Sequence, residues 1–168
     1  MKFKGVSFVI VLVAAVFIAF PVLAADKGSV AVELTGRKVV KDASGKEKFE
    51  SADKAKPGDV IEYRAVYRNK GKKPVTNVKG TVPVPQGTEY IAGSAVPSPV
   101  TASLDGKEYA PVPLKRQVKL PSGKEETREV PYAEYRLIRW DLKTLAPGKN
   151  ASVSMRVKIS TELPSATK

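Results

Sequence analysis

Arginine and tyrosine side chains offer the clearest binding chemistry in this sequence. Arg128, Arg136 and Arg139 lie close in sequence to Tyr132. A guanidinium group pairs with acidic groups, and a tyrosine ring can stack on a sugar ring. We therefore treat Arg128, Tyr132, Arg136 and Arg139 as candidate contacts for an anion or an acidic glycan. The competing interpretation is that tyrosines such as Tyr135 line a core, with their hydroxyls at its rim.

Catalytic chemistry has little support in the sequence, because the chain contains neither histidine nor cysteine. Without imidazole or thiolate, the usual triads, dyads and zinc or copper sites cannot be assembled. There is no nucleophile elbow, phosphate-binding glycine loop or calcium loop. Glu125, Glu126 and Asp141 could form a carboxylate pair, although carboxylates on a charged hairpin are usually solvated. We predict a protein that is not an enzyme, with no catalytic residue, no metal and no cofactor.

The charge of the chain is strongly positive, with 29 basic residues, 17 acidic residues and a formal net charge of +12. Basic residues are scattered, in doublets such as Lys72-Lys73 and Lys115-Arg116, and no run reaches five. Such a balance is typical of a solubilising surface. The alternative is an anionic partner such as acidic polysaccharide, lipid headgroups or nucleic acid.

Residues 1–24 have the layout of a cleavable secretory signal peptide. Two lysines precede an uncharged apolar run, residues 6–20, and small residues lead up to a cleavage site between Ala24 and Ala25. The alternative is an uncleaved anchor, since about 20 apolar residues cross a bilayer. Cleavage would leave 144 residues with a net charge of +10.

Apolar residues in the remaining chain alternate with polar ones, which is the period of a β-strand. The clearest runs are 30–34, 61–67, 78–84 and 151–159. Frequent turn signals separate these runs, and no window outside the signal segment predicts a helix. The fold class we predict is all-β: a signal-peptide helix, then a single immunoglobulin-like antiparallel β-sandwich of about seven to nine strands over residues 25–160, and a short polar tail, 161–168.

Three segments between the long runs carry their own predictions. Asp105-Gly106 predicts a two-residue hairpin, and residues 121–123 (Pro-Ser-Gly) predict a second hairpin joining residues 114–120 to 127–132. Residues 41–56 are polar and charged, which indicates a loop or short hairpin at one end of the domain.

A series of short motifs resembles one known family. The series comprises Pro57-Gly58-Asp59, Asn69-Lys70-Gly71, Val82–Thr88, Tyr90–Ser94, Trp140-Asp141-Leu142 and Leu145–Gly148. It is similar to the conserved repeat domain of bacterial and archaeal surface proteins, known as domain of unknown function eleven, with an insertion between Ser94 and Trp140. The resemblance implies an immunoglobulin-like sandwich at a cell surface. Some relatives are cysteine-rich, and their cross-linked envelope role does not extend to a chain without cysteine.

The motif residues have a simple interpretation as framework. Asn69 and Gly71 suit a tight turn, because both residue types tolerate a positive φ. Trp140 is the only tryptophan, and a single buried tryptophan commonly anchors a sandwich core.

Two functions remain open on this reasoning. The first is a non-enzymatic exported structural or adhesive module of the bacterial cell surface or periplasm, whose partners are other copies of itself or envelope components. The alternative is a soluble basic binding module for acidic glycans or other polyanions. The expected location is periplasmic, cell-surface or extracellular. We expect no specific nucleic-acid partner, and no membrane contact after the signal is cleaved.

Overall fold

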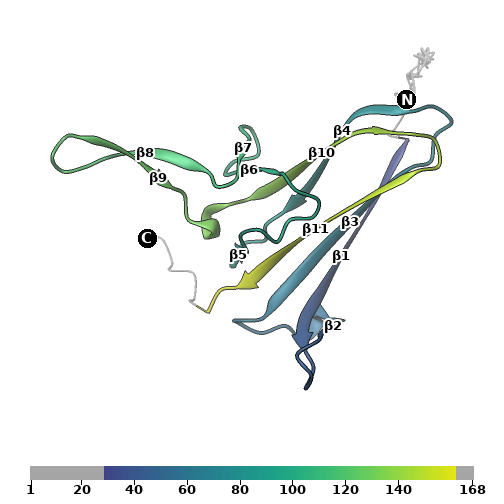
Figure 1. Ribbon diagram of the computed structural model, residues 1–168, viewed down its shortest axis with the longest axis horizontal. Coiled ribbons are helices and arrows are strands. Elements are labelled where there is room, and N and C mark those ends of the chain that lie inside the picture. The colour runs from purple at the N-terminus through teal and green to yellow at the C-terminus, as the bar shows by residue number, and fades with distance from the viewer. Residues whose placement is uncertain (1–28, 162–168) are drawn as a thin grey trace, which may run out of the picture.

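The computed structural model describes residues 29–161, and this part of the chain is an antiparallel, all-β sandwich (Figure 1). It contains eleven strands and two short 3-10 turns, η1 (Ala52–Lys54) and η2 (Tyr132–Glu134). No helix within the described residues is long and apolar enough to cross a membrane. The predicted signal peptide, its cleavage site at Ala24 and Ala25, and residues 162–168 lie outside the described part.

The first sheet has five strands in the order β2-β1-β3-β11-β5. Their bounds are β1 Val30–Lys41, β2 Glu47–Ser51, β3 Val60–Asn69, β5 Thr88–Tyr90 and β11 Asn150–Ile159. The predicted period of two is confirmed in β11, where Val153, Met155 and Val157 are buried and their neighbours are not. Alternation places one set of side chains against the second sheet and the other set towards solvent.

The second sheet has four strands in the order β4-β10-β6-β7. Their bounds are β4 Val75–Pro83, β6 Thr101–Ser103, β7 Ala110–Pro111 and β10 Leu137–Leu145. The core lies between the two sheets, with Ile138 and Trp140 of β10 almost fully buried. The indole N–H of Trp140 donates to the carbonyl of Pro97 at 2.8 Å, which satisfies its one polar group. The prediction that Trp140 belongs to the framework is confirmed.

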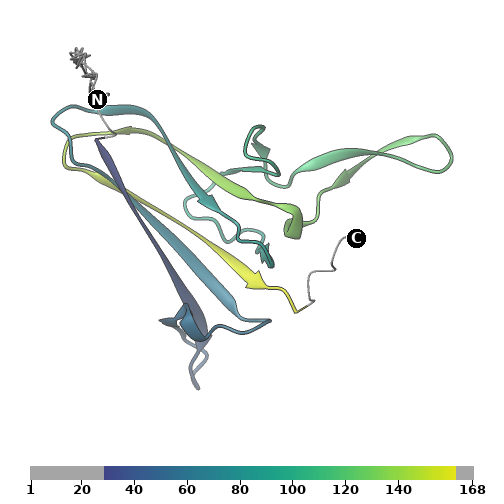
Figure 2. The ribbon, with the colours of Figure 1, turned by 180° about the vertical axis from the view of Figure 1, so that it is seen from behind.

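A separate two-stranded ribbon, β8 (Lys115–Lys119) and β9 (Glu125–Glu129), projects from the sandwich (Figures 1 and 2). It lies within the insertion between Ser94 and Trp140. The turn predicted at residues 121–123 is confirmed, and it accounts for the ribbon. Residues 41–56 likewise contain the predicted short hairpin, which joins β1 to β2.

The two packed sheets together have nine strands, within the predicted seven to nine, and the separate ribbon adds two more. One local prediction was wrong. Asp105-Gly106 does not form a two-residue hairpin, since β6 pairs with β7 through Ala102 and Ala110, leaving a longer connection. The Asp105 carboxylate instead accepts the backbone N–H of Lys107 at 2.9 Å, closing a local turn and lowering the pKa of Asp105.

The edge strand β4 is closed to a further strand by its own neighbours. The Tyr67 hydroxyl donates to the carbonyl of Thr81 at 3.0 Å and accepts its N–H at 2.8 Å. Pro83, two residues along the strand, has no N–H to donate. These features are typical of sheet edges that are protected against edge-to-edge pairing.

Candidate functional site

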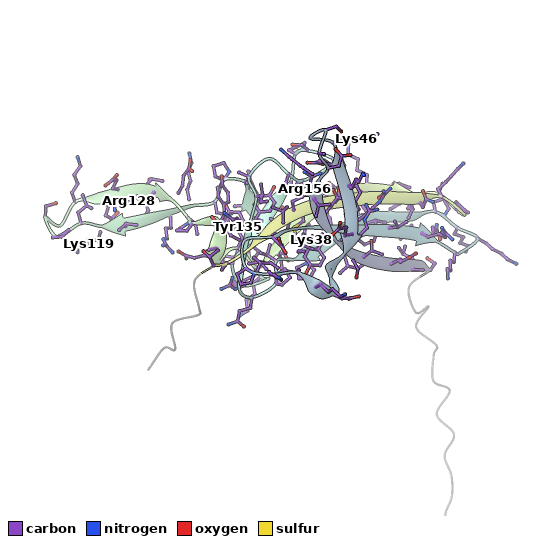
Figure 3. All side chains as sticks on the ribbon, turned by 90° about the horizontal axis from the view of Figure 1, so that it is seen from below. Lys38, Lys46, Lys119, Arg128, Tyr135 and Arg156 are labelled. Atoms are coloured by element: carbon purple, nitrogen blue, oxygen red, sulfur yellow. The ribbon has the colours of Figure 1, made fainter. Side chains whose placement is uncertain are left out.

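The ribbon formed by residues 115–129, which we name the arm, exposes nearly all of its side chains. Only Val118 within its strands is half-buried. The Gly123 N–H donates to the Leu120 carbonyl at 2.8 Å, and Gly123 has a φ of 83°, a conformation that glycine adopts without strain. Lys119 and Arg128 stand far from the body of the sandwich (Figure 3). The arm therefore presents a charged surface without packing against a second layer.

The base of the arm is, in contrast, firmly built. We name this base the root and define it as Leu114, Val130 and the three tyrosines Tyr90, Tyr132 and Tyr135. Leu114 and Val130 are buried, and the Val130 N–H donates to the Leu114 carbonyl at 2.9 Å. The Leu114 N–H donates to the Tyr135 hydroxyl at 2.6 Å. Leu114 and Val130, the residues on either side of the arm, are thus both fixed in the core.

The tyrosines of the root pack on one another. The rings of Tyr90 and Tyr135 are stacked with centroids 5.9 Å apart, and Tyr132 meets both edge-on at 5.8 and 5.2 Å. Burial raises the pKa values of Tyr90 and Tyr135. Because these two rings are buried, they are not available to stack on a sugar, and Tyr132 is only partly exposed.

One ion pair ties the arm to Glu134 of η2, which lies between Tyr132 and Tyr135 of the root. Arg116 donates two hydrogen bonds to the Glu134 carboxylate at 2.6 and 2.9 Å, and this contact raises the pKa of Arg116. The two-bond geometry is the strong form of such a pair. Both side chains are substantially exposed, so its contribution to stability is small.

The four candidate contacts predicted from the sequence do not form one site. Arg128 lies on the arm and pairs with Glu126 at 3.1 Å. Arg136 donates to the carbonyls of Ala133 and Tyr135 at 3.0 and 3.1 Å, so it caps the root.

Arg139 lies on β10, where its guanidinium group covers the Tyr109 ring at 3.2 Å from the centroid. It also donates to the Thr81 hydroxyl at 3.4 Å. The three arginines therefore lie in three places: Arg128 on the arm, Arg136 at the root and Arg139 on the second sheet.

A second charged region lies where β3 leads into β4 and β10 leads into β11. We name it the basic end and define it as five exposed residues: Arg68, Lys70, Lys72, Lys73 and Lys149. Within the described part of the chain none of the five forms an ion pair, unlike Arg116 and Arg128. Residues 63–88 and 142–161 contain no Asp or Glu. A carboxylate does occur nearby on β1, where Glu33 faces Val66 of β3.

A buried asparagine joins the two loops of the basic end. The Asn69 side chain is 0% exposed, and its amide N–H groups donate to the carbonyls of Lys73 and Leu145, both at 2.8 Å. Its side-chain oxygen accepts the Gly71 N–H at 2.8 Å. Leu145 is 76 residues away along the chain, so this one side chain holds distant segments in register.

The loop between β3 and β4 also contacts the start of β1. The Lys70 N–H donates to the Ser29 carbonyl at 2.7 Å. A Cβ on Gly71 would lie 2.7 Å from the Cβ of Ser29, so the close approach requires glycine. Beside this contact is a depression of about 600 Å³, whose lining includes Lys72 and Lys73.

The basic end was not predicted. Asn69 and Gly71 do belong to a turn, as predicted, but the positive φ given as the reason was wrong. Neither residue has a positive φ; one is a buried hydrogen-bonding staple and the other allows a close contact. The signal that could have revealed this end is the long absence of acidic residues around Lys70 and Lys149.

Every carboxylate in the described residues whose pKa is shifted has a pKa below its ordinary value. Hydrogen bonding to Lys38 lowers the pKa of Asp59, and the corresponding bonds from Lys79 and Arg156 lower those of Asp141 and Glu47. A general acid needs the opposite shift. Residues 29–161 hold no group of three or more Asp, Glu, His or Cys side chains able to bind a metal.

The chain matches no known family, no curated protein and no solved structure. The resemblance to the surface-protein repeat domain therefore remains a prediction from its motifs.

Proposed function

We propose that this protein is an exported, non-enzymatic structural or adhesive module of the cell envelope, and that it makes contact through its arm. The observation that carries the proposal is the contrast between a solvent-exposed ribbon and its built root. An isolated two-stranded hairpin is only marginally stable in water. The tyrosine stack and the Tyr135 hydrogen bond hold the base of the ribbon in place. A flexible loop of the same length would not require such contacts.

The arm also offers a mode of contact. Each of its two strands has one hydrogen-bonded neighbour, so each has an outer edge with unpaired backbone groups. A partner strand can add to such an edge, and alternate side chains then provide specificity. The β4 edge, by comparison, is closed by Tyr67 and Pro83. The arm is thus the better candidate for pairing with an envelope component or with another copy.

The test compares the chain beginning at Ala25 with a variant in which residues 117–127 are replaced by Asn-Gly. Arg116 and Arg128, which face each other, would then close a two-residue turn, and the Arg116–Glu134 pair would be kept. We expect the wild-type chain to sediment with cell envelopes or to form larger species by light scattering. The shortened variant should remain folded, monomeric and soluble.

Equal association of both chains would show that the arm is not the contact. If neither chain associates with envelopes or with itself, the structural or adhesive role is wrong. Export is tested separately, by mass spectrometry of the protein recovered outside the cytoplasm, which should begin at Ala25.

A second candidate function, polyanion binding, is favoured by the basic end. Its five cations are exposed and form no ion pair within residues 29–161, so their charge can neutralise an anionic polymer or surface. Binding of this kind releases counterions and weakens steeply as salt rises. Affinity for an acidic polysaccharide or for anionic vesicles that does not change with salt would contradict this function.

A further inference from the structure

We infer that the basic end docks on the anionic phosphate headgroups of a phospholipid bilayer. This inference rests on the second candidate function, polyanion binding, and names the partner. It departs from the expectation of no membrane contact after signal cleavage. Three features of the basic end support it: its charge, the types of its residues and its place next to the start of the described chain.

The charge of the basic end is concentrated and strongly positive, although Glu33 of β1 lines the same depression as Arg68 and Lys70. Arg68, Lys70, Lys72 and Lys73 lie on or beside one loop, and the Asn69 N–H donates to the Lys149 carbonyl at 3.0 Å, which brings the fifth cation alongside. Each basic residue near an anionic bilayer strengthens binding by roughly fivefold. Five residues on neighbouring loops are comparable to the clusters of basic residues that bind anionic lipid in other proteins.

The residue types at the basic end favour a diffuse array of phosphates over a defined sugar. Four of the five cations are lysines, which act as flexible point charges suited to many mobile anions, whereas arginine provides a planar fork that binds one carboxylate or phosphate in a fixed geometry. Residues 68–79 and 143–151 contain no aromatic residue. Glycan sites commonly use aromatic faces, and this end has none in either segment that forms it.

The start of the described chain lies at the same end. Ser29 accepts the Lys70 N–H and lines the depression that contains Lys72 and Lys73. Eight residues separate Ser29 from the apolar run 6–20, and such a segment spans at most about 30 Å. If the apolar run is kept as an anchor, the basic end cannot lie far from the bilayer. If the run is removed, the new α-amino group at Ala25 adds a positive charge only four residues from Ser29.

Docking through the basic end would orient the whole molecule. Strand β10 starts at Leu137, directly after the root, and ends at Leu145, which is bonded to Asn69. Those two residues are roughly 27 Å apart along an extended strand. The arm projects from the root side of the sandwich (Figure 2). A bilayer at the basic end would therefore leave the arm directed away from it and open to a partner.

The experiment measures co-sedimentation of the chain beginning at Ala25, which contains the entire described sandwich, with vesicles. The vesicles are phosphatidylcholine with or without phosphatidylglycerol. The test variant carries Lys70→Gln, Lys72→Gln, Lys73→Gln and Lys149→Gln. A matched control carries Lys46→Gln, Lys54→Gln, Lys56→Gln and Lys158→Gln, four exposed lysines at the other end of the sandwich, so both variants lose the same charge.

We expect binding only to vesicles that contain phosphatidylglycerol, with a partition coefficient lowered several hundred-fold in the test variant, at roughly fivefold per lysine. The partition coefficient of the control variant should fall much less. Circular dichroism of both variants establishes that they remain folded, so that lost binding is not lost structure.

Three outcomes would overturn the inference. Equal losses in both variants would show that net charge, and not the basic end, determines binding. The chain could instead bind an acidic polysaccharide or duplex DNA more tightly than the vesicles, and lose that binding in the test variant. That result would show that the basic end binds another polymer, so the lipid partner would be wrong and the polyanion-binding function would stand. Binding to none of these would reject both the lipid partner and the polyanion-binding function.

Discussion

The arm and the basic end both present charge at an end of the sandwich, but different interactions hold them in place. At the root, three aromatic rings pack together, and one tyrosine hydroxyl binds the backbone N–H of Leu114. At the basic end, a single buried amide, Asn69, makes three side-chain hydrogen bonds to the backbone. Apolar packing can be adjusted in small steps, whereas a buried polar group costs most when its partners are lost. The two ends should therefore respond differently to small changes.

The largest effect is expected for Asn69→Ala. The substitution leaves two carbonyl groups and one N–H without their partner, which should lower the free energy of unfolding by about 3 kcal/mol. Urea unfolding followed by the fluorescence of Trp140 measures the change. Asn150→Ala, an exposed asparagine at the start of β11, is the control and should change stability by less than about 0.5 kcal/mol. An equal, small effect at both positions would mean that Asn69 is not a staple.

A smaller effect is expected for Tyr135→Phe. The variant keeps the ring and its stacking with Tyr90 but leaves the buried Leu114 N–H without an acceptor. We expect a loss of about 2 kcal/mol and faster trypsin cleavage at the basic residues of the arm. The basic end should keep its native protection against hydrogen exchange. Loss of protection at both ends would contradict the separation of the two regions.

Raising the pH above 10 should reduce the difference in the free energy of unfolding between the wild type and Tyr135→Phe. Burial raises the pKa of Tyr135 above its ordinary value of 10.0, so the unfolded chain ionises first. The stability linked to this group is present below pH 10 and is lost as pH rises through the folded value. Phenylalanine does not titrate. Urea unfolding of both chains at neutral pH and above pH 10 measures the difference in their free energies of unfolding, which should be smaller above pH 10. A larger difference above pH 10 would contradict the buried, neutral state of Tyr135.

The smallest effect on stability is expected from shortening the arm. Replacement of residues 117–127 by Asn-Gly removes side chains that are exposed, apart from the half-buried Val118 and Leu120, and leaves the root intact, so the free energy of unfolding should change by less than about 0.5 kcal/mol. The same urea titration measures this change. A loss comparable to that of Asn69→Ala would show that the arm stabilises the sandwich, and would weaken its interpretation as a contact surface.

Much of the fold could be predicted from the sequence because strand periodicity is local. The alternation in residues 61–67 and 151–159 predicted β3 and β11, and Pro121-Ser122-Gly123 predicted the turn of the arm. The failures came from pairings that bypass near neighbours. Asp105-Gly106 resembles a tight hairpin, but Ala102 pairs with Ala110, beyond the range of the turn.

The candidate contacts show the same limit more sharply. Arg128, Arg136 and Arg139 are close in sequence, yet pairing with Glu126, capping of the root and stacking on Tyr109 separate them. Lys72 and Lys149 are far apart in sequence, yet Asn69 holds their loops together. Proximity along the chain therefore grouped arginines that the fold separates and missed cations that the fold brings together.

The sequence by itself determined the all-β class, the core position of Trp140, the turn of the arm and the positive charge. These properties depend on residue type and short-range spacing, which any local conformation preserves. The tertiary structure decided which cations lie together, which tyrosines are buried and where the arm is anchored. Those properties depend on contacts between segments such as Asn69 and Leu145, and folding alone brings such segments within hydrogen-bonding distance.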